Sequence, residues 1–572
     1  MPKSWKLKTV DPTAAGRIQD LLGCHAATAS LLAQKNLTSE TELKHFLQPS
    51  LHDLRPPFAL TDMHKAVDRI TLALQKQEKI LIFGDYDVDG VTATTLISQF
   101  LDEIGARVQY YIPDRMTEGY GLKVGHIDEL ALPDQIDLII TVDCGIASHE
   151  AVSAAKTHHI DIIISDHHDP PATLPAALAV VNPKRIDCSS DLSHLSGVGI
   201  VFYLAMALRM HLRDLGYFNH VSEPNLKKYC DLVALGTVAD MVPLVQENRI
   251  LTVSGLQVLR TTPRPGLKAL AQSSGIDYRH VDAEDVAFRL GPRINAAGRM
   301  DHASRATTLL YAQTEEKADH HANKLNYFNK LRQDTESGVL NDILATIEKQ
   351  GDLLSSPCLV FASPGWHPGV VGIVAARLTR KYNKPTVLIS IEEDIGIGSA
   401  RSIPGIDIRA LLDACGHHLL GYGGHPMAAG LQIAVKEIKS FRTSLENAIQ
   451  AVSAGKDLSP EFPIDYILDL PDITKKLLDE IAALGPFGNQ NPEPVFLAHD
   501  VRVRNAAIVG GSHRRMQISP SNTTHPTLTA IQFNVDQSVP QPDHFTKIAY
   551  HLQWNRWNGN KSIQLVIKGY HI

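Results

Sequence analysis

The chain has 572 residues, 44% hydrophobic and 20% charged, which is enough for several domains that each bury a core. Its net charge of -7 excludes a globally basic protein, so any nucleic-acid-binding surface must be local. The six cysteines are scattered without a C-x-x-C pair, which argues against a zinc ribbon or a disulfide framework and favours a reduced, cytoplasmic setting. No apolar run approaches the roughly 18 residues of a membrane span, so we expect no membrane partner.

The first half of the chain predicts an α/β fold. Residues 1–55 indicate a small, mostly helical N-terminal extension. In residues 56–260, short runs of Ile, Leu and Val alternate with amphipathic stretches, which is typical of a mostly parallel sheet covered on both faces. We expect strands at 79–83, 107–112, 136–142 and 160–165, and a helix from about 91 to 104.

The second half predicts three further segments. Residues 261–350 contain a small-residue-rich stretch followed by a long connecting helix from about residue 315. Residues 351–455 indicate a second α/β domain, with strands at 358–362 and 386–389. Residues 456–572 alternate in a β manner and predict a small barrel or sandwich.

Three aspartates, Asp85, Asp87 and Asp89, alternate directly after the apolar run 80–83. Clustered carboxylates at the end of a buried strand repel one another, and a divalent cation neutralises them through the oxygen ligands it prefers. The sequence therefore predicts a metal site here.

Three more polar groups fall at or near the ends of expected strands. Asp143 follows 139–142, Asp166-His167-His168 follows 162–165, and Asp240 closes the apolar segment 235–239, which we also expect to be a strand end. Ligands of open α/β sheets gather at such positions. Carboxylates with one or two imidazoles and no thiolate favour Mn²⁺ or Mg²⁺, and two such ions would suit phosphoryl transfer. Each acid alone would be an ordinary helix cap or turn residue, so the prediction depends on the whole set.

These motifs resemble, in the same order, the four motifs of the DHH phosphoesterase family. They read Asp-Tyr-Asp-Val-Asp-Gly, Val-Asp-Cys-Gly, Asp-His-His and Gly-Thr-Val-Ala-Asp-Met-Val-Pro-Leu. The resemblance covers nearly the whole chain and is strongest to the family's branch of single-strand-specific DNA exonucleases. It implies two ions and these metal ligands: Asp85, Asp87, Asp89, Asp143, His167 and Asp240. It implies catalytic roles for Asp89, His167 and His168. Phe83 stands where many relatives place a histidine, so Asp85 is expected to complete the first ion's shell.

Substrate contacts are expected outside the metal motifs. The glycine-rich segment 421–430 is expected to be a loop, and it resembles the substrate-gripping motif of the family's second domain. There Gly424 would bring the backbone close to a phosphate and His425 would donate to it. The resemblance also implies nucleic-acid contacts from Arg293, Asn295, Arg299, His367, Ser399 and Arg401. For the C-terminal segment it implies an OB-fold. Basic and aromatic residues of this segment would contact single strands: Arg502, Arg504, His513, Arg514, Arg515, Trp554, Arg556 and Trp557.

The resemblance implies a metal-dependent exonuclease of single-stranded DNA. Its 5′-to-3′ polarity, release of 5′-mononucleotides and role in DNA repair and recombination are likewise implied. A single-strand-binding protein and a recombination helicase are the expected protein partners. Two alternatives remain open at this point. One is a phosphodiesterase of the same family that acts on oligoribonucleotides or cyclic dinucleotides, and the other is a DNA-binding relative that has lost catalysis.

Overall fold

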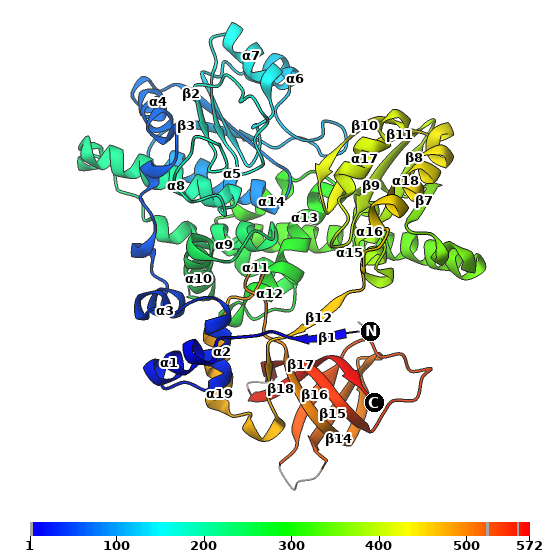
Figure 1. The fold of residues 1–572 in the computed structure, drawn as a ribbon. Helices are drawn as coiled ribbons and strands as arrows, with labels where there is room; N and C mark the ends of the chain where they lie inside the picture. Colours follow the sequence, from blue (N-terminus) through cyan, green and yellow to red (C-terminus); the bar gives the residue numbers. More distant parts are fainter. Residues whose placement is uncertain (1–3, 262, 522–525, 558–559) are drawn as a thin grey trace.

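A computed structural model describes residues 4–261, 263–521, 526–557 and 560–572. It is built from a parallel α/β unit, a helical middle, a second α/β unit and a C-terminal barrel (Figure 1). Among the described residues, no helix combines the length and apolar character needed to cross a lipid bilayer.

The first α/β unit is built on a five-stranded parallel sheet in the order β3-β2-β4-β5-β6. Its strands are β2 (Lys79–Gly84), β3 (Arg107–Tyr111), β4 (Leu138–Val142), β5 (Asp161–Ser165) and β6 (Ala179–Val181). Successive strand residues face opposite sides, so Ile80 and Ile82 pack against one group of helices while Leu81 and Phe83 pack against another. Helices α4 (Met63–Lys76), α5 (Val88–Glu103) and α8 (Gly197–Asp214) cover the first face, and α7 (His149–Thr157) covers the second. The expected α/β sheet is confirmed.

A helical middle connects the two α/β units. It comprises α9 (Cys230–Ala239), α10 (Gln246–Thr261), α11 (Pro265–Ser273), α12 (Ala283–Asp285), α13 (Gly291–Met300), α14 (Ser304–Leu310) and α15 (Glu315–Lys349). Its apolar side chains continue the core of the first unit, which extends to Leu325 on α15. The C-terminal third of α15, from Val339 onward, packs instead against the second unit. This one helix of 35 residues therefore sets the spacing between the two units.

The second α/β unit is a five-stranded mixed sheet in the order β10-β11-β9-β8-β7. Its elements are β7 (Leu359–Pro364), α16 (Pro368–Tyr382), β8 (Thr386–Glu392), β9 (Ile395–Arg401), α17 (Ile408–Ala414), β10 (Leu419–His425), β11 (Ala428–Ala434) and α18 (Ile438–Ser453). The glycine-rich segment 421–430 is not a loop, as expected above, but a hairpin in which Gly424 opposes Ala429 and His425 opposes Ala428. Its turn residues are Pro426 and Met427, and its second strand, β11, pairs in antiparallel fashion with β9.

The C-terminal unit is a closed five-stranded barrel, because β14 pairs with both β15 and β17. The barrel strands are β14 (Phe496–Val509), β15 (His513–Pro520), β16 (Leu528–Gln532), β17 (His544–Trp557) and β18 (Asn560–His571). The short strand β13 (Tyr466–Ile467) pairs with β14 outside this ring, and helix α19 is Lys475–Ala483. The expected barrel is confirmed.

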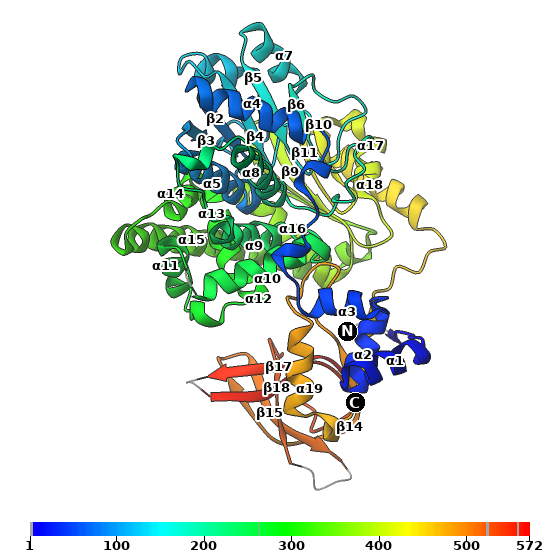
Figure 2. The ribbon, with the colours of Figure 1, turned by 90° about the vertical axis from the view of Figure 1, so that its left-hand side faces the viewer.

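The N-terminal residues pack against the C-terminal unit although they are about 450 residues apart in sequence (Figure 2). Strand β1 (Ser4–Leu7) pairs in parallel with β12 (Glu461–Ile464). Helices α1 (Pro12–Leu22), α2 (Ala26–Gln34) and α3 (Glu40–Leu47) contribute apolar side chains to the same core as α19 and the barrel. The two ends of the chain therefore form one structural unit.

Candidate metal centre and substrate surface

The first aspartate motif forms the tight connection between β2 and α5. Asp87 caps α5, and its Oδ1 accepts a hydrogen bond of 3.0 Å from the Gly90 amide. A Cβ at Gly90 would lie 2.4 Å from the carbonyl oxygen of Asp85, so only glycine fits this turn. Asp89 lies in the first turn of α5, where its two oxygens accept amide hydrogen bonds of 2.6 Å from Gly197 and 2.9 Å from Val198. The N-terminus of α8 thus fixes the orientation of the Asp89 carboxylate.

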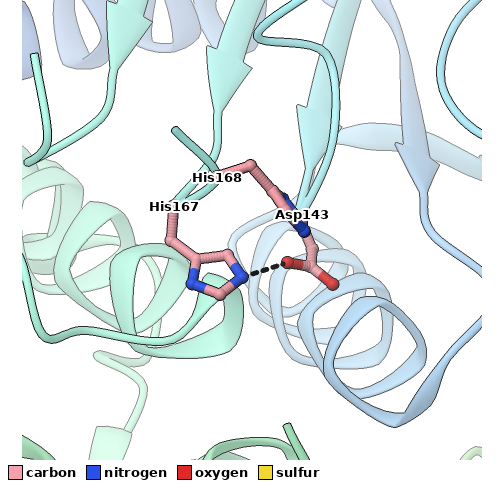
Figure 3. A group of neighbouring side chains, drawn as sticks. All are labelled: Asp143, His167 and His168. Carbon is pink, nitrogen blue, oxygen red and sulfur yellow. Dashed lines mark ion pairs between the residues drawn. The ribbon is translucent and has the colours of Figure 1, made fainter. Parts of the chain in front are cut away.

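Asp143 and His167 follow the neighbouring strands β4 and β5, so parallel pairing brings them to the same edge. Nε2 of His167 lies 3.2 Å from Oδ1 of Asp143, and the ring points toward that carboxylate (Figure 3). The same nitrogen lies 3.6 Å from Oδ2 of Asp240 and 4.0 Å from Oδ2 of Asp89. Four motifs that are far apart in sequence therefore converge around one imidazole.

The expectation that Asp240 ends a strand is wrong, because residues 230–239 form helix α9 and Asp240 is its C-cap. Every residue from Cys230 to Val238 is buried, so the helix is covered on all sides and its mostly apolar sequence shows no amphipathic period. A short apolar run with this pattern does not distinguish a buried helix from a buried strand. The carboxylate still reaches His167 from the helix end.

Several buried polar atoms in this cluster make no hydrogen bond to any described residue, and the 3.2 Å contact between His167 and Asp143 lacks the geometry of one. They are Oδ1 of Asp85, Oδ1 of Asp143 and Nε2 of His167. Leaving such groups unpaired in a protein interior is costly, and each is a metal-ligating atom type. The ligand atoms lie within 4.8 Å of one another in each of three sets: Asp85, Asp87 and Asp143; Asp89, His167 and Asp240; and Asp143, His167 and His168. Asp143 and His167 each belong to two sets, so the residues present fit cations at neighbouring positions.

The pKa values of the cluster show how strongly it lacks positive charge. Burial, and then the charge of Asp87, raises the pKa of Asp89 to about 7. Burial and the charges of Asp89 and Asp87 raise the pKa of Asp240 to about 9, and the same causes raise the pKa of Asp143 well above its usual range. Burial lowers the pKa of His167 to about 3, so its ring is neutral and has a nitrogen lone pair available to coordinate a metal. Burial and neighbouring like charges thus favour the protonated carboxyl groups, and a bound cation would favour their ionised forms instead.

His168 is held by Asp166, a residue to which the sequence motif assigned no role. Oδ1 of Asp166 accepts hydrogen bonds from Nδ1 of His168 at 2.8 Å and from its amide at 3.0 Å, while Oδ2 accepts from the Ile146 amide at 2.9 Å. Burial opposes protonation of His168, but the bond to Asp166 prevails and raises the pKa of His168 to about 9. The hydroxyl of Tyr120 lies 3.1 Å from the same Nδ1. The position of Asp166 at the end of β5, beside two histidines, was the available sequence signal.

The stretch 291–299, expected to contact nucleic acid, forms most of α13 and lies beside the first aspartate motif. Gly298 packs on the backbone of Tyr86, which has the guanidinium of Arg115 over its ring at 4.8 Å. Arg293 donates to Oδ1 of Asn326 on α15, and Asn295 is half-buried on α13. The remaining arginine of this stretch is Arg299, which donates to the Gly369 carbonyl at 2.8 Å.

Arg299 and Arg401 bring positive charge close to the acidic cluster. Burial, followed by the charges of Arg115, Arg332 and Arg401, lowers the pKa of Arg299 to about 9. Across the described ranges, neither Arg299 nor Arg401 has a carboxylate within 4 Å. Guanidinium groups that are buried together and lack an acid are typical of an anion site.

The second unit presents its expected substrate residues from β9, the β10–β11 hairpin and the start of α16. Arg401 donates to Oγ of Ser399 at 2.9 Å, so these two side chains form one polar group on β9. His425 is exposed at the hairpin tip, and its Nδ1 lies 3.9 Å from Oδ2 of Asp169, two residues after His167. His367 caps α16, since its Nδ1 accepts the Gly369 amide at 3.0 Å. The hairpin therefore reaches across to the metal cluster.

The basic residues of the barrel differ in their surroundings. Arg514 is buried and donates to the carbonyl of Pro542, so it supports the barrel itself. Arg515 is exposed on the neighbouring position of β15, and Arg502 is exposed on β14. Trp554 packs against the core, and its Nε1 donates to Asp479 at 2.9 Å. Arg502 and Arg515 therefore differ from Arg514 and Trp554 in their exposure, and the side chains of Arg556 and Trp557 lie outside the described residues.

Three models of known families match separate parts of the chain. The DHH family N-terminal domain matches residues 79–237, the DHHA1 domain residues 355–451 and the RecJ OB domain residues 464–569.

Curated relatives match over most of the chain. The single-stranded-DNA-specific exonuclease RecJ of Bacillus subtilis is 35% identical over 99% of this chain and 70% of its own length. The protein of the same name from Escherichia coli is 36% identical over 94% of each chain. Among solved structures, RecJ of Thermus thermophilus in complex with Mn²⁺ superimposes with a TM-score of 0.83 at 28% identity, covering 100% of this chain and 79% of that one. A second structure of that protein, in complex with Mg²⁺, gives a TM-score of 0.76.

Proposed function

The chain belongs to the RecJ family of single-stranded-DNA-specific exonucleases, and on this premise we propose that it hydrolyses single-stranded DNA from one end with Mn²⁺ or Mg²⁺ as cofactor. The observation that carries the proposal is the set of buried ligand atoms of Asp85, Asp143 and His167 at the carboxyl edge of the sheet, which make no hydrogen bond within the described part of the chain. We further propose 5′-to-3′ digestion, release of 5′-mononucleotides and a role in DNA repair and recombination.

We propose that Asp85, Asp87, Asp89, Asp143, His167 and Asp240 hold two divalent ions. Bound there, the ions would stabilise charge on a phosphoryl group and make water a nucleophile at neutral pH. The protein's own contribution is rigidity, because the amides of Gly197 and Val198 fix Asp89 and the sheet fixes Asp143 and His167. Such fixed ligands need no reorganisation during the reaction.

His168 is the proposed proton donor or phosphate contact. Its pKa of about 9 keeps the ring protonated at neutral pH, and Asp166 occupies Nδ1. The remaining N–H, on Nε2, is therefore free to donate to an anionic oxygen. A positioned acid of this kind contributes roughly 10²- to 10⁴-fold to a rate.

Arg299, Arg401, Ser399 and His425 are the proposed binding groups for the terminal nucleotide. Arg299 and Arg401 supply positive charge that no carboxylate within 4 Å neutralises in the described ranges, and His425 reaches Asp169 beside the metal cluster. Gly424 allows the hairpin backbone to turn close to its partner strand, since a Cβ there would lie 2.4 Å from the Ala428 carbonyl. Arg293, Asn295 and His367 would extend the path along α13 and α16.

Two observations weigh against the alternatives. An enzyme for dinucleotides has little use for the additional nucleic-acid-binding unit matched at 464–569. A catalytically inactive scaffold gains nothing from keeping six acidic or imidazole groups together in one buried cluster. As protein partners we propose a single-strand-binding protein and a recombination helicase, and as location the cytoplasm.

The test uses a 30-nucleotide single strand, its duplex and a dinucleotide, each with Mn²⁺ or EDTA. We expect the single strand to be digested with Mn²⁺ and the duplex to be spared. A bulky block on the 5′ end should stop digestion, whereas the same block on the 3′ end should not. Preference for the dinucleotide, equal digestion of duplex, or activity in EDTA would each contradict the proposal. Inhibition by the 3′ block instead would reverse the polarity alone.

A further inference from the structure

A cavity whose lining includes none of the metal-cluster residues lies where three parts of the chain meet. It has a volume of about 380 Å³ and is bounded by the N-terminal helices, residues 244–246 and the segment 484–494. Much of its wall is apolar, contributed by Leu31, Leu37, Phe46, Leu484 and Phe487. This volume lies within the range of small-molecule sites, which combine apolar walls with a few polar groups.

The polar groups of this cavity carry an excess of positive charge. Lys8 and Lys35 line it, and Arg249 stacks on Phe46 with its guanidinium carbon 3.9 Å from the ring centre. The one acidic residue in the wall is Asp465, whose Oδ1 accepts from Lys8 at 2.6 Å and whose Oδ2 accepts from the Val495 amide. That carboxylate is therefore already occupied by Lys8, and among the lining residues one positive charge remains, that of Lys35, with the guanidinium of Arg249 stacked on Phe46 of the wall.

Of the two lysines in the wall, Lys35 is the one without a carboxylate partner among the described residues. Its Nζ donates to Oδ1 of Asn491 at 2.6 Å, and no carboxylate of the described chain lies within 4 Å of it. Arg249 donates only to carbonyls, those of Phe46, Leu484 and Ala483. Burial, then the charges of Arg249 and Lys8, lowers the pKa of Lys35 to about 8. A bound anion would offset both the burial and the repulsion.

We propose that this cavity binds a small organic anion with an apolar or aromatic body, its anionic group at Lys35 and its body against Phe46 and Leu484. The charge complementarity selects an anion, and the apolar walls select against inorganic ions. The site does not involve the metal centre, so its occupancy is measurable without nuclease activity.

The test is a fluorescence titration of the full chain with anilinonaphthalene sulfonate, an aromatic anion. We expect one saturable site in the unaltered chain and in Lys35→Arg. Lys35→Met should weaken binding about tenfold or more, because a charge-assisted hydrogen bond is lost. Lys44→Met is the matched control, since Lys44 is exposed on the nearby helix α3 and should behave like the unaltered chain. Thermal unfolding establishes that each variant is folded.

Displacement of the bound probe identifies the ligand chemistry. N-acetyl-phenylalanine should displace it and N-acetyl-phenylalanine amide should not. Equal binding by Lys35→Met and the unaltered chain would overturn the proposal. Displacement by inorganic phosphate as effective as that by the aromatic acid would show that the apolar wall is not used and would also overturn it. Displacement by a single-stranded oligonucleotide alone would assign the cavity to the DNA path instead.

Discussion

The clearest consequence of the crowded carboxylates is that Asp143→Asn should stabilise the metal-free protein while abolishing its activity. The ligand atoms of Asp85, Asp87 and Asp143 lie within 4.8 Å of one another. At an effective dielectric constant of about 20, two unit charges at that separation repel by about 3.5 kcal/mol. Because 4.8 Å is the largest of these separations, a closer fully charged pair would repel more strongly, but the raised pKa values of Asp143 and Asp85 mean that protonation already relieves part of the repulsion. Asparagine also fits the backbone, because Asp143 has φ of 61° and asparagine adopts the left-handed region readily.

The assay is thermal unfolding in EDTA and in Mn²⁺ at pH 8. In EDTA we expect the midpoint of Asp143→Asn to rise by roughly 3 to 10 °C, because about 1 to 3 kcal/mol shifts a unit of this size by that amount. In Mn²⁺ the variant should gain much less stability than the unaltered chain, since a ligand is lost. Asp102→Asn is the control, because Asp102 is exposed at the far end of α5, and it should change neither midpoint. A lower midpoint in EDTA, or an undiminished response to Mn²⁺, would refute the reasoning.

Three further predictions concern the same edge of the sheet. Asp166→Asn should lower kcat on single-stranded DNA by about 10- to 100-fold and move the pH profile, because His168 loses its charged partner, while an unchanged profile would contradict the positioning role. Gly197→Ala should remove activity and the Mn²⁺-induced rise in midpoint, because the new Cβ would lie 2.4 Å from Oδ1 of Asp143, and Gly338→Ala, which meets nothing within 4 Å, should leave both intact. In the folded protein the pKa of Asp89 is about 7, above its ordinary 3.8. Protonation of Asp89 therefore stabilises the metal-free fold fully below pH about 4, and this contribution is lost as the pH rises through 7. The midpoint difference between Mn²⁺ and EDTA should therefore be larger at pH 8 than at pH 6, and a smaller difference at pH 8 would contradict this sign.

The expected strands of the first unit match the observed ones to within one or two residues, and the physical reason is local. Runs such as Ile80 to Phe83 are apolar on both faces and are therefore readable as buried parallel strands without any knowledge of their neighbours. The helix that follows begins three residues earlier than expected, at Val88, because the Asp87 side chain caps it. The carboxylate motifs were visible for the same reason, since each directly follows an apolar run.

Asp240 and the hairpin at 419–434 show where local pattern fails. The apolar run before Asp240 is equally compatible with a buried strand or a buried helix, and contacts of α9 with α5, α8 and α10 decide for the helix. The glycine-rich segment was expected to be a loop, but pairing with β9 extends it into strands. Arg514 similarly owes its buried position, and Trp554 its partly buried one, to strand register in the barrel.

The sequence by itself determined the chemistry of the site, because the aspartates and histidines follow apolar runs as a set and the order of their motifs matches one family. Only the tertiary structure decided which of these groups share a cation and which hold another in place. Asp166 differs from Asp143 in nothing that the sequence displays, yet its carboxylate is saturated by three hydrogen bonds while Oδ1 of Asp143 has none. The structure also decided that Lys8, Lys35 and Asp465 meet around one cavity, since β1 pairs with β12 across some 450 residues of chain. Hydrogen-bond partners and enclosed volume are properties of contacts between distant segments, which no local pattern contains.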